Sequence, residues 1–373
     1  MSPSGVMIGH FEPLHLGQMR SILHASGQVK TLHIIITVHP CPHPNYPVSL
    51  QDKARWLQMA CRDLPFIQIH TSDEISLPVH DNFESVLVDV HETNTKLHLL
   101  LQRLNIIDVA VTIESLTPHA QDTHDANLPI LFVASNHPLA QPALAEQFIL
   151  PLKSTPEQIG FNSADIARDP IAHWPAIHPE ARGSYTKTVA IVGGESSGKT
   201  TLIHKLANYY GASFVLEMGR LYVSTDLGGS EVGLQYSDYA PIVLDHAEAI
   251  RQAKYRAPAP VTFVDTDFVT TQAFCEEYEG RTHPFVAACI DEFRLDHTLF
   301  LANNTPWVDD GLRSLGDATA RERFEQRLTE IFARHQITPY RISSPDYDER
   351  YRLAIEYINQ HLYQSSRETI TDF

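Results

Sequence analysis

An eight-residue segment in the middle of the chain has the residue types and spacing needed to hold a nucleoside triphosphate. Gly193-Gly-Glu-Ser-Ser-Gly-Lys-Thr200 fits the pattern G-x-x-x-x-G-K-[ST] of a P-loop. Gly193 and Gly198 would let the backbone curl so that successive N–H groups point at phosphate oxygens. Lys199 would reach the β- and γ-phosphates, and the Thr200 hydroxyl would hold Mg²⁺. The predicted ATP-binding residues are Gly193, Gly194, Glu195, Ser196, Ser197, Gly198, Lys199, Thr200 and Thr201.

The segments on either side of this loop agree with that interpretation. Val189 to Val192 are small apolar residues that predict a buried strand, and apolar residues at helical spacing follow the loop. Strand, glycine loop and helix in this order are the context that a P-loop requires. The alternative is a structural glycine turn with an exposed lysine, and the flanking pattern argues against it. The helical positions are Leu202, Ile203, Leu206 and Ala207.

Three acidic residues could act on an acceptor hydroxyl or on the metal. Val261 to Asp267 is an apolar run that ends in Asp265 and Asp267, which is the form of a Walker B strand. An acid at this position can hold Mg²⁺ or accept a proton from an acceptor hydroxyl. We predict Thr200 and Asp265 as metal ligands. Glu217, at the end of a predicted strand over 212–217 that continues into Met218-Gly-Arg220, is the alternative base.

A loop arginine completes the candidate phosphoryl-transfer site. A predicted strand over 298–302 is followed by Trp307-Val-Asp-Asp310-Gly-Leu-Arg313. Small-molecule kinases place a lid at this point, and Arg313 would contact the phosphates as the lid closes. The alternative is a solvated surface charge. The neighbouring Trp307 and Asp310 favour a functional loop.

The first half of the chain begins with a second candidate nucleotide site. A strand over 5–9, a helix over 19–25 and a strand over 32–37 predict a βαβ unit, whose first turn is the expected ligand site. The turn resembles the G-x-F-x-P-x-H-x-G-H signature of nucleotidyltransferases that transfer an adenylyl group from ATP. Gln18 stands where the last histidine belongs, and it can donate hydrogen bonds but carries no positive charge. The matching positions are Gly9, Phe11, Pro13, His15 and Gly17.

The second signature of these nucleotidyltransferases, I-S-x-T-x-I-R, has also lost its phosphate-binding residues. When 161–174 is aligned on Pro170 and Trp174, the serine, threonine and arginine positions hold Asn162, Ala164 and Ala167. Arg168 lies one residue further on, which is a rotation of about 100° on a helix. We therefore predict that adenylyl transfer is weak or absent. The predicted nucleotide-binding residues of this half are Gly9, Phe11, His15, Gln18 and Arg168.

Composition and patterning predict a two-domain α/β protein. Strands that alternate with helices predict two doubly wound parallel-sheet domains, over 1–180 and 187–373, joined by a polar segment with proline and glycine. The formal net charge of -17 argues against a general nucleic-acid or anionic-membrane binder. The four cysteines form no C-x-x-C pair, which suits a reducing cytosol. The sequence shows neither a signal peptide nor a membrane span, so we expect a cytoplasmic protein.

Taken together, the motifs resemble those of one family, the bifunctional nicotinamide mononucleotide (NMN) adenylyltransferase/nicotinamide riboside kinases known as NadR. The resemblance implies that the second half phosphorylates nicotinamide riboside with MgATP to give NMN, and that the ancestral first half converts NMN to NAD. Some members carry an N-terminal helix-turn-helix that binds DNA; this chain starts directly on the adenylyltransferase strand, so we expect no DNA partner. The segments that carry the resemblance are 193–199, 235–239, 265–275, 278–280 and 307–316.

The resemblance also implies a riboside site and leaves the role of the first half open. Tyr236, Tyr239 and Trp307 could enclose the cationic nicotinamide ring, although core packing is the default for such aromatics. Asp310 is a further candidate riboside ligand. Two alternatives to a weak or inactive first half remain: a working adenylyltransferase, or a non-catalytic module that senses a nucleotide such as NAD or forms oligomers. We expect a homo-oligomer.

Overall fold

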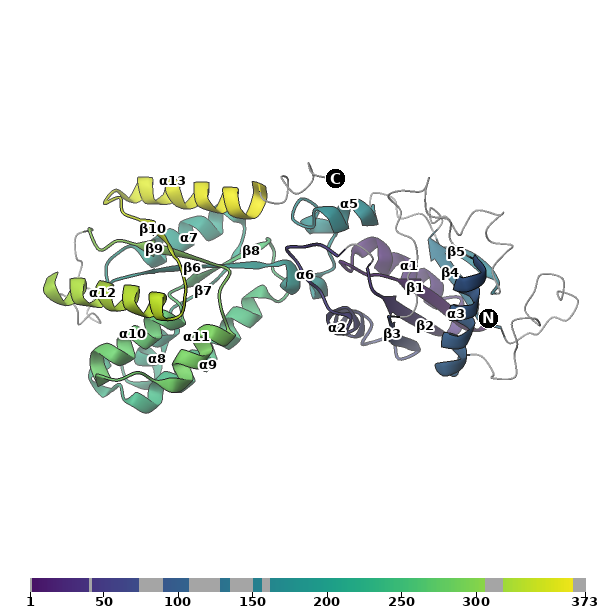
Figure 1. Ribbon diagram of the computed structural model, residues 1–373, viewed down its shortest axis with the longest axis horizontal. Helices are drawn as coiled ribbons and strands as arrows, with labels where there is room; N and C mark the ends of the chain where they lie inside the picture. The colour runs from purple at the N-terminus through teal and green to yellow at the C-terminus, as the bar shows by residue number, and fades with distance from the viewer. Residues whose placement is uncertain are drawn as a thin grey trace, which may run out of the picture. The chain divides into compact units, whose positions relative to one another are not determined.

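The structure, a computed structural model, describes residues 2–39, 42–73, 90–106, 128–134, 150–155, 162–305 and 318–364. The chain divides into two compact units, Met1–Ser184 and Tyr185–Phe373. Each unit is built on a five-stranded parallel sheet with helices packed against it (Figure 1). The predicted fold class, two doubly wound α/β domains, is thus confirmed. No helix in the described part of the chain has both the length and the apolar character that crossing a bilayer requires.

In the first unit the strand order β3-β2-β1-β4-β5 places β1 at the centre of the sheet. The chain leaves β1 toward β2 on one side and later returns to β4 on the other side. The carboxyl end of β1 is therefore the topological switch point, where ligands of open parallel sheets bind. The strands are β1 (Ser2–Gly9), β2 (Val29–Thr37), β3 (Ile67–Ser72), β4 (Ile130–Ala134) and β5 (Leu152–Thr155); the helices are α1 (Leu16–Ser26), α2 (Leu50–Ala60), α3 (Val90–Arg103), α5 (Ser163–Arg168) and α6 (Pro179–Tyr185).

The second unit also has its first strand at the centre of the sheet, in the order β10-β9-β6-β8-β7. The P-loop follows the carboxyl end of this central strand, β6. The strands are β6 (Lys187–Gly193), β7 (Ser213–Val215), β8 (Val261–Asp265), β9 (His297–Leu301) and β10 (Tyr340–Ile342). The helices are α7 (Lys199–Tyr210), α8 (Met218–Asp226), α9 (Tyr239–Lys254), α10 (Phe268–Glu279), α11 (Pro284–Glu292), α12 (Ala318–Arg334) and α13 (Tyr347–Ile358).

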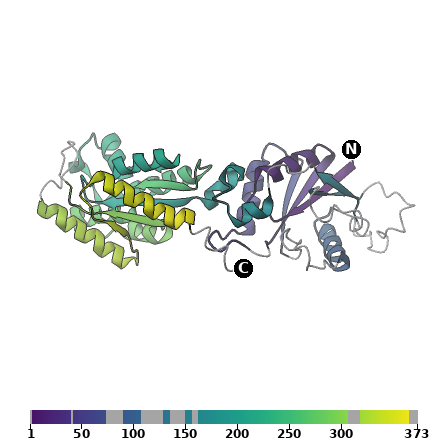
Figure 2. The same cartoon turned by 90° about the horizontal axis from the view of Figure 1, so that it is seen from above.

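The continuous apolar run of β6 follows from burial on both faces of its sheet. Successive side chains of a strand point to opposite faces. Val189 and Ile191 accordingly pack in one core with residues of α7 and α13, whereas Ala190 and Val192 pack in another with residues of α9 to α12. Figure 1 shows α7 and α13 on one side of the sheet and α9 to α11 on the other, and Figure 2 looks onto the side that α13 covers. The central strand is thus fixed from both sides, which gives the loop that follows it a rigid base.

The structure differs from the predicted elements where local patterns were weak. Met218 to Arg220, which we interpreted as the end of a strand, form the first turn of α8, and the strand itself is limited to β7. Helices α10 and α11 and strand β5 were not predicted. The predicted strand over 108–113 lies outside the described residues, as does nearly all of the predicted helix over 82–91.

Candidate functional site

The P-loop has a backbone that only glycine allows at its two ends. Gly193 has φ 151° and Gly198 has φ 84°, in the left-handed region that other residues avoid. A Cβ atom at Gly193 would lie 2.6 Å from the Leu301 carbonyl oxygen, and one at Gly198 would lie 2.6 Å from the Tyr347 ring. The loop opens directly into the N-terminus of α7, whose free N–H groups favour anions. This geometry suits a bound phosphate chain.

Lys199 lies across the mouth of this loop. Its ammonium group donates hydrogen bonds to the carbonyl oxygens of Gly193 (3.1 Å) and Gly194 (3.0 Å). These are neutral acceptors on a partly exposed cation, so negatively charged phosphate oxygens would be stronger partners. The predicted phosphate-binding lysine is therefore positioned at the loop.

Arg350, which the sequence analysis did not identify, stabilises the P-loop through a hydrogen bond to its backbone. This α13 side chain is 1% exposed and donates to the carbonyl oxygens of Ser197 (2.5 Å), Ala302 (2.8 Å) and Ser344 (2.6 Å). It thereby ties together the loop, the end of β9 and the start of α13. A signal was present, because Arg350 lies four residues before the buried Ala354 on one face of a helix.

Thr200 and Asp265 form the predicted metal-binding pair. The Thr200 hydroxyl donates to Asp265 Oδ2 at 2.5 Å. Burial, and secondly the charge of Glu217, raise the pKa of Asp265, while Lys199 and the Thr200 hydrogen bond oppose that shift. The other oxygen, Oδ1, is buried and has no hydrogen-bond partner within the described ranges. Hard oxygen donors beside a phosphate-binding loop fit Mg²⁺, which usually takes one or two protein ligands together with phosphate and water.

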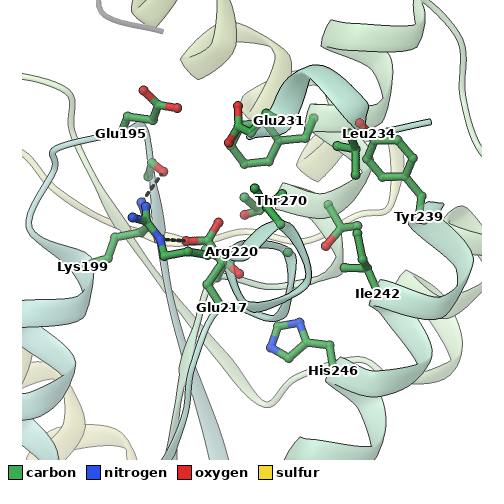
Figure 3. A pocket seen from close by; sticks show the side chains of 16 residues that line it. Glu195, Lys199, Glu217, Arg220, Glu231, Leu234, Tyr239, Ile242, His246 and Thr270 are labelled. Carbon is green, nitrogen blue, oxygen red and sulfur yellow. Dashed lines mark hydrogen bonds and ion pairs between the residues drawn. The ribbon is translucent and has the colours of Figure 1, made fainter. Parts of the chain in front are cut away.

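A cavity opens beside the P-loop and holds a further set of polar side chains (Figure 3). Glu217 is the N-cap residue of α8, and its Oε2 lies 3.5 Å from Nε of Arg220 in the first turn of that helix. Arg220 was missed as a site residue because Met218 to Arg220 was interpreted as strand. The lining residues are Gly193, Glu195, Lys199, Glu217, Gly219, Arg220, Val223, Glu231, Leu234, Tyr239, Ile242, His246, Thr266, Thr270, Thr271 and Phe274.

The structure brings only some of the predicted riboside-binding residues to this cavity. Tyr239 lines it, but Tyr236 does not. The Tyr236 ring instead carries the Arg281 guanidinium at 3.6 Å from its centroid, and its hydroxyl donates to the Thr282 carbonyl at 3.2 Å. The other predicted residues of this group, Trp307 and Asp310, and the lid residue Arg313 lie outside the described residues.

Asp267 is not among the lining residues, and its carboxylate caps a helix. Oδ1 accepts hydrogen bonds from the backbone N–H of Thr270 (2.9 Å) and from its hydroxyl (3.0 Å) at the N-terminus of α10. Burial raises the pKa of Asp267 to about 6, although these hydrogen bonds act against the shift. Asp267 therefore has a structural role as the cap of α10, and an experiment can distinguish this role from the predicted catalytic role.

Asp267→Asn is expected to stabilise the protein at neutral pH and to leave phosphoryl transfer within about tenfold of wild type. Asparagine caps a helix as well as aspartate does but buries no charge. The folded pKa of Asp267 lies above the unfolded value of 3.8, so the cost of its charge is absent below pH 4, appears as the pH rises through 6 and is full above it. We expect a gain of about 1–3 kcal/mol at pH 7.5 and none at pH 4, measured by urea unfolding. A loss of activity of about 100-fold or more in a folded variant would instead assign Asp267 a catalytic role.

In the first unit, the predicted nucleotide site is assembled but its polar groups bond to one another. His15 begins α1 and is 1% exposed; burial lowers its pKa to about 4, and its Nε2 lies 2.9 Å from Oγ of Ser163. Gln18 Oε1 accepts the backbone N–H of His15 at 3.1 Å. Arg168 pairs with Asp165 at 3.0 Å on the exposed face of α5. The Ser163 contact was not predicted.

The other two predicted residues of this site build the turn after β1. Phe11 is 2% exposed, and its ring would contact a Cβ atom at Gly9 at 3.1 Å. A side chain at Gly9 would therefore displace the Phe11 ring. Both residues shape the backbone at the switch point.

Known proteins resemble the second half of this chain alone and also the chain over nearly its whole length. A family model described as an AAA domain matches residues 188–350. The trifunctional NAD biosynthesis/regulator protein NadR of Escherichia coli (strain K12) is 36% identical over 364 residues, which are 95% of this chain and 82% of that protein. The protein of the same name from Salmonella typhimurium (strain LT2) is 36% identical over 366 residues, with the same shares covered.

Two solved structures share the fold over nearly the whole chain. A NadR protein in complex with NR superposes with a TM-score of 0.70 at 20% identity, over 97% of this chain and 98% of that one. A NadR protein in complex with NAD and AMP-PNP gives 0.69 at 20% identity, over 97% and 96%. At this identity the likeness concerns the fold, while the two bacterial relatives establish the kinship: the chain belongs to the NadR family.

Proposed function

We propose that residues 187–373 form a kinase that transfers the γ-phosphoryl group of ATP to the 5′-hydroxyl of nicotinamide riboside, giving NMN for NAD biosynthesis. The observation that carries this proposal is that a P-loop lysine and the acid Glu217 line one cavity. The names of the curated relatives support a role in NAD biosynthesis, and the solved complex with NR supports the choice of acceptor.

The roles of Lys199, Thr200, Asp265 and Glu217 are supported by their positions, and those of Arg313, Trp307 and Asp310 by the sequence alone. Lys199 stabilises charge on the transferring phosphoryl group, and Arg313 of the loop after β9 does so as the lid closes. Thr200 and Asp265 would hold Mg²⁺, which would supply positive charge to the phosphates. Glu217 orients or deprotonates the acceptor hydroxyl, since it is the one acid of our three candidates that lines the cavity. Trp307 and Asp310 complete the riboside site.

For residues 1–180 we propose an NMN adenylyltransferase-like domain of weak or no activity. A neutral His15 bonded to Ser163 offers no positive charge to an α-phosphate. The side chain of Gln18 is engaged at the start of α1, and Arg168 is paired with Asp165 on the exposed face of α5. A working bifunctional enzyme, and a non-catalytic sensor or oligomerisation module, are the alternatives. NAD and ATP are the ligands to test for the sensor.

One assay separates these possibilities. The full chain is incubated with MgATP and either nicotinamide riboside or NMN, and NMN, NAD, ADP and pyrophosphate are resolved by chromatography. We expect NMN and ADP in equal amounts from the riboside, and almost no NAD or pyrophosphate from NMN. NAD formation at a rate comparable to riboside phosphorylation would show a bifunctional enzyme. No ADP release with the riboside would refute the kinase assignment.

A further inference from the structure

One helix supplies a polar wall to the cavity beside the P-loop. Tyr239, Ile242 and His246 of α9 all line this cavity. Residues three, four and seven apart fall on one face of a helix, and seven residues span about 10 Å along its axis. Figure 3 shows the three side chains reaching from α9, with His246 at the Glu217 side of the view and Tyr239 at the Leu234 side. The wall therefore has a polar group at each end and an apolar group between them.

Both polar side chains on this wall are buried, and each has one polar atom that forms no hydrogen bond within the described residues. Tyr239 and His246 are each 1% exposed. Tyr239 Oη and His246 Nε2 have no hydrogen-bond partner among the residues that the structure describes. Buried polar atoms are almost always bonded, so two exceptions on one cavity wall call for a bound partner. A ligand with hydrogen-bonding groups separated by an apolar face would supply it.

The charge of the cavity restricts what that ligand can be. Burial lowers the pKa of His246 to about 4 and raises that of Tyr239, so both side chains are uncharged at neutral pH. The lining residues include three acids, Glu195, Glu217 and Glu231, and two cations, Lys199 and Arg220. Lys199 donates to P-loop carbonyls, and Arg220 is paired with Glu217. Acids therefore outnumber cations around this cavity and both cations already have partners, so the wall formed by α9 suits a cation better than a carboxylate.

We propose that Tyr239 and His246 bind the acceptor nucleoside through hydrogen bonds and select a pyridinium base with an uncharged carboxamide over one with a carboxylate. This inference rests on the proposed function and deepens it, because it names the substrate class that the acceptor site accepts. Nicotinamide riboside carries one net positive charge and a neutral amide. Its nicotinic acid analogue would place a carboxylate against two neutral side chains in a cavity where acids outnumber cations, which is unfavourable in a buried site.

Tyr239→Phe is the primary test, because it removes only the hydroxyl. We expect kcat/KM for nicotinamide riboside to fall about 10- to 100-fold, mainly through KM, with KM for ATP unchanged. The melting temperature should not fall, because the deleted hydroxyl has no partner within the described residues. A structural role would lower stability together with affinity. Tyr185→Phe makes the same change at a buried tyrosine that does not line the cavity, and it should leave KM for the riboside unchanged.

His246→Leu and His246→Gln provide the second test. Leucine should weaken nicotinamide riboside binding as Tyr239→Phe does, whereas glutamine, which retains a neutral hydrogen-bonding group, should restore part of it. Wild type should prefer nicotinamide riboside to nicotinic acid riboside by about 100-fold, and His246→Leu should reduce that preference. Equal use of both ribosides by wild type, or wild-type affinity for nicotinamide riboside in both Tyr239→Phe and His246→Leu, would overturn the inference.

The same variants keep this inference separate from the kinase assignment. Riboside binding is measured by calorimetry as well as by turnover. Wild type that binds nicotinamide riboside through Tyr239 but does not phosphorylate it would refute the kinase proposal and support the inference. Wild type that phosphorylates the riboside while Tyr239→Phe and His246→Leu behave like wild type would do the reverse.

Discussion

Lys199→Met is expected to reduce riboside phosphorylation by about 10³-fold or more, almost entirely in kcat. The ammonium group is the cation of the P-loop itself, and the charge that develops on the transferring phosphoryl oxygens has to be stabilised there. Methionine retains the length of the side chain but loses the charge. Because the two hydrogen bonds of Lys199 go to loop carbonyls at a partly exposed position, the fold should survive their loss.

The matched control is Lys205→Met on the same helix. Lys205 is exposed and lies 3.5 Å from Asp348, a contact that contributes little to stability at the surface. We expect turnover within about twofold of wild type, and the same melting temperature for both variants. Initial rates of ADP release with saturating riboside and MgATP measure the effect. A Lys199→Met protein that still phosphorylated the riboside at a substantial rate would remove the P-loop from the reaction.

The P-loop could be predicted from sequence because its chemistry is local. A strand, two glycines, a lysine and a threonine within fourteen residues define both the backbone and the ligand. Arg350 and His246 belong to the same unit but act across long separations in the chain, Arg350 on Ser197 and His246 on a cavity shared with Lys199. The residue pattern of a single helix does not show which strand or loop that helix packs against. Their only sequence signal was a polar residue on an otherwise apolar helical face.

Asp267 shows how one pattern can carry two meanings. An apolar strand that ends in Asp265-Thr-Asp267 predicts acids at a metal site, and Asp265 does lie beside Thr200. Asp267 is followed three residues later by Thr270, at the start of an apolar helix, which is also the spacing of a helix cap. The capping interpretation required α10, whose hydrophobic pattern was too weak to predict it.

In the first unit, the sequence showed which signature residues are missing, but it did not show which contacts the residues at those positions form. The absent residues at positions 18, 162, 164 and 167 were visible in the sequence. The bond between His15 and Ser163 spans 148 residues and depends on how α5 approaches α1, which no local motif specifies. Asn162, at the position of the lost serine, accepts the backbone N–H of Ala164 and caps α5. The substitutions thus form internal contacts where phosphate contacts are expected.

Glu217→Gln is expected to lower kcat for riboside phosphorylation about 10²- to 10⁴-fold, the usual contribution of a general base. Glutamine keeps the size of the side chain and an oxygen that Arg220 can bond, so KM for the riboside should change little. Loss of the Glu217 charge also removes one of the two causes that raise the pKa of Asp265. Asp265 therefore stays ionised more readily in the variant, and a fall in rate cannot be assigned to its protonation.

Glu231→Gln is the matched control for this experiment. Glu231 lines the same cavity, but its carboxylate accepts the Tyr278 hydroxyl at 2.9 Å rather than pairing with Arg220. We expect a higher KM for the riboside and a kcat within about threefold of wild type. The variant loses an interaction that is equally strong in the ground state and the transition state, so the chemical step is unaffected. If Glu217→Gln instead kept kcat within tenfold while Asp265→Asn abolished turnover, proton acceptance would belong to the acid beside Thr200, and Glu217 would serve to hold Arg220 at the cavity wall.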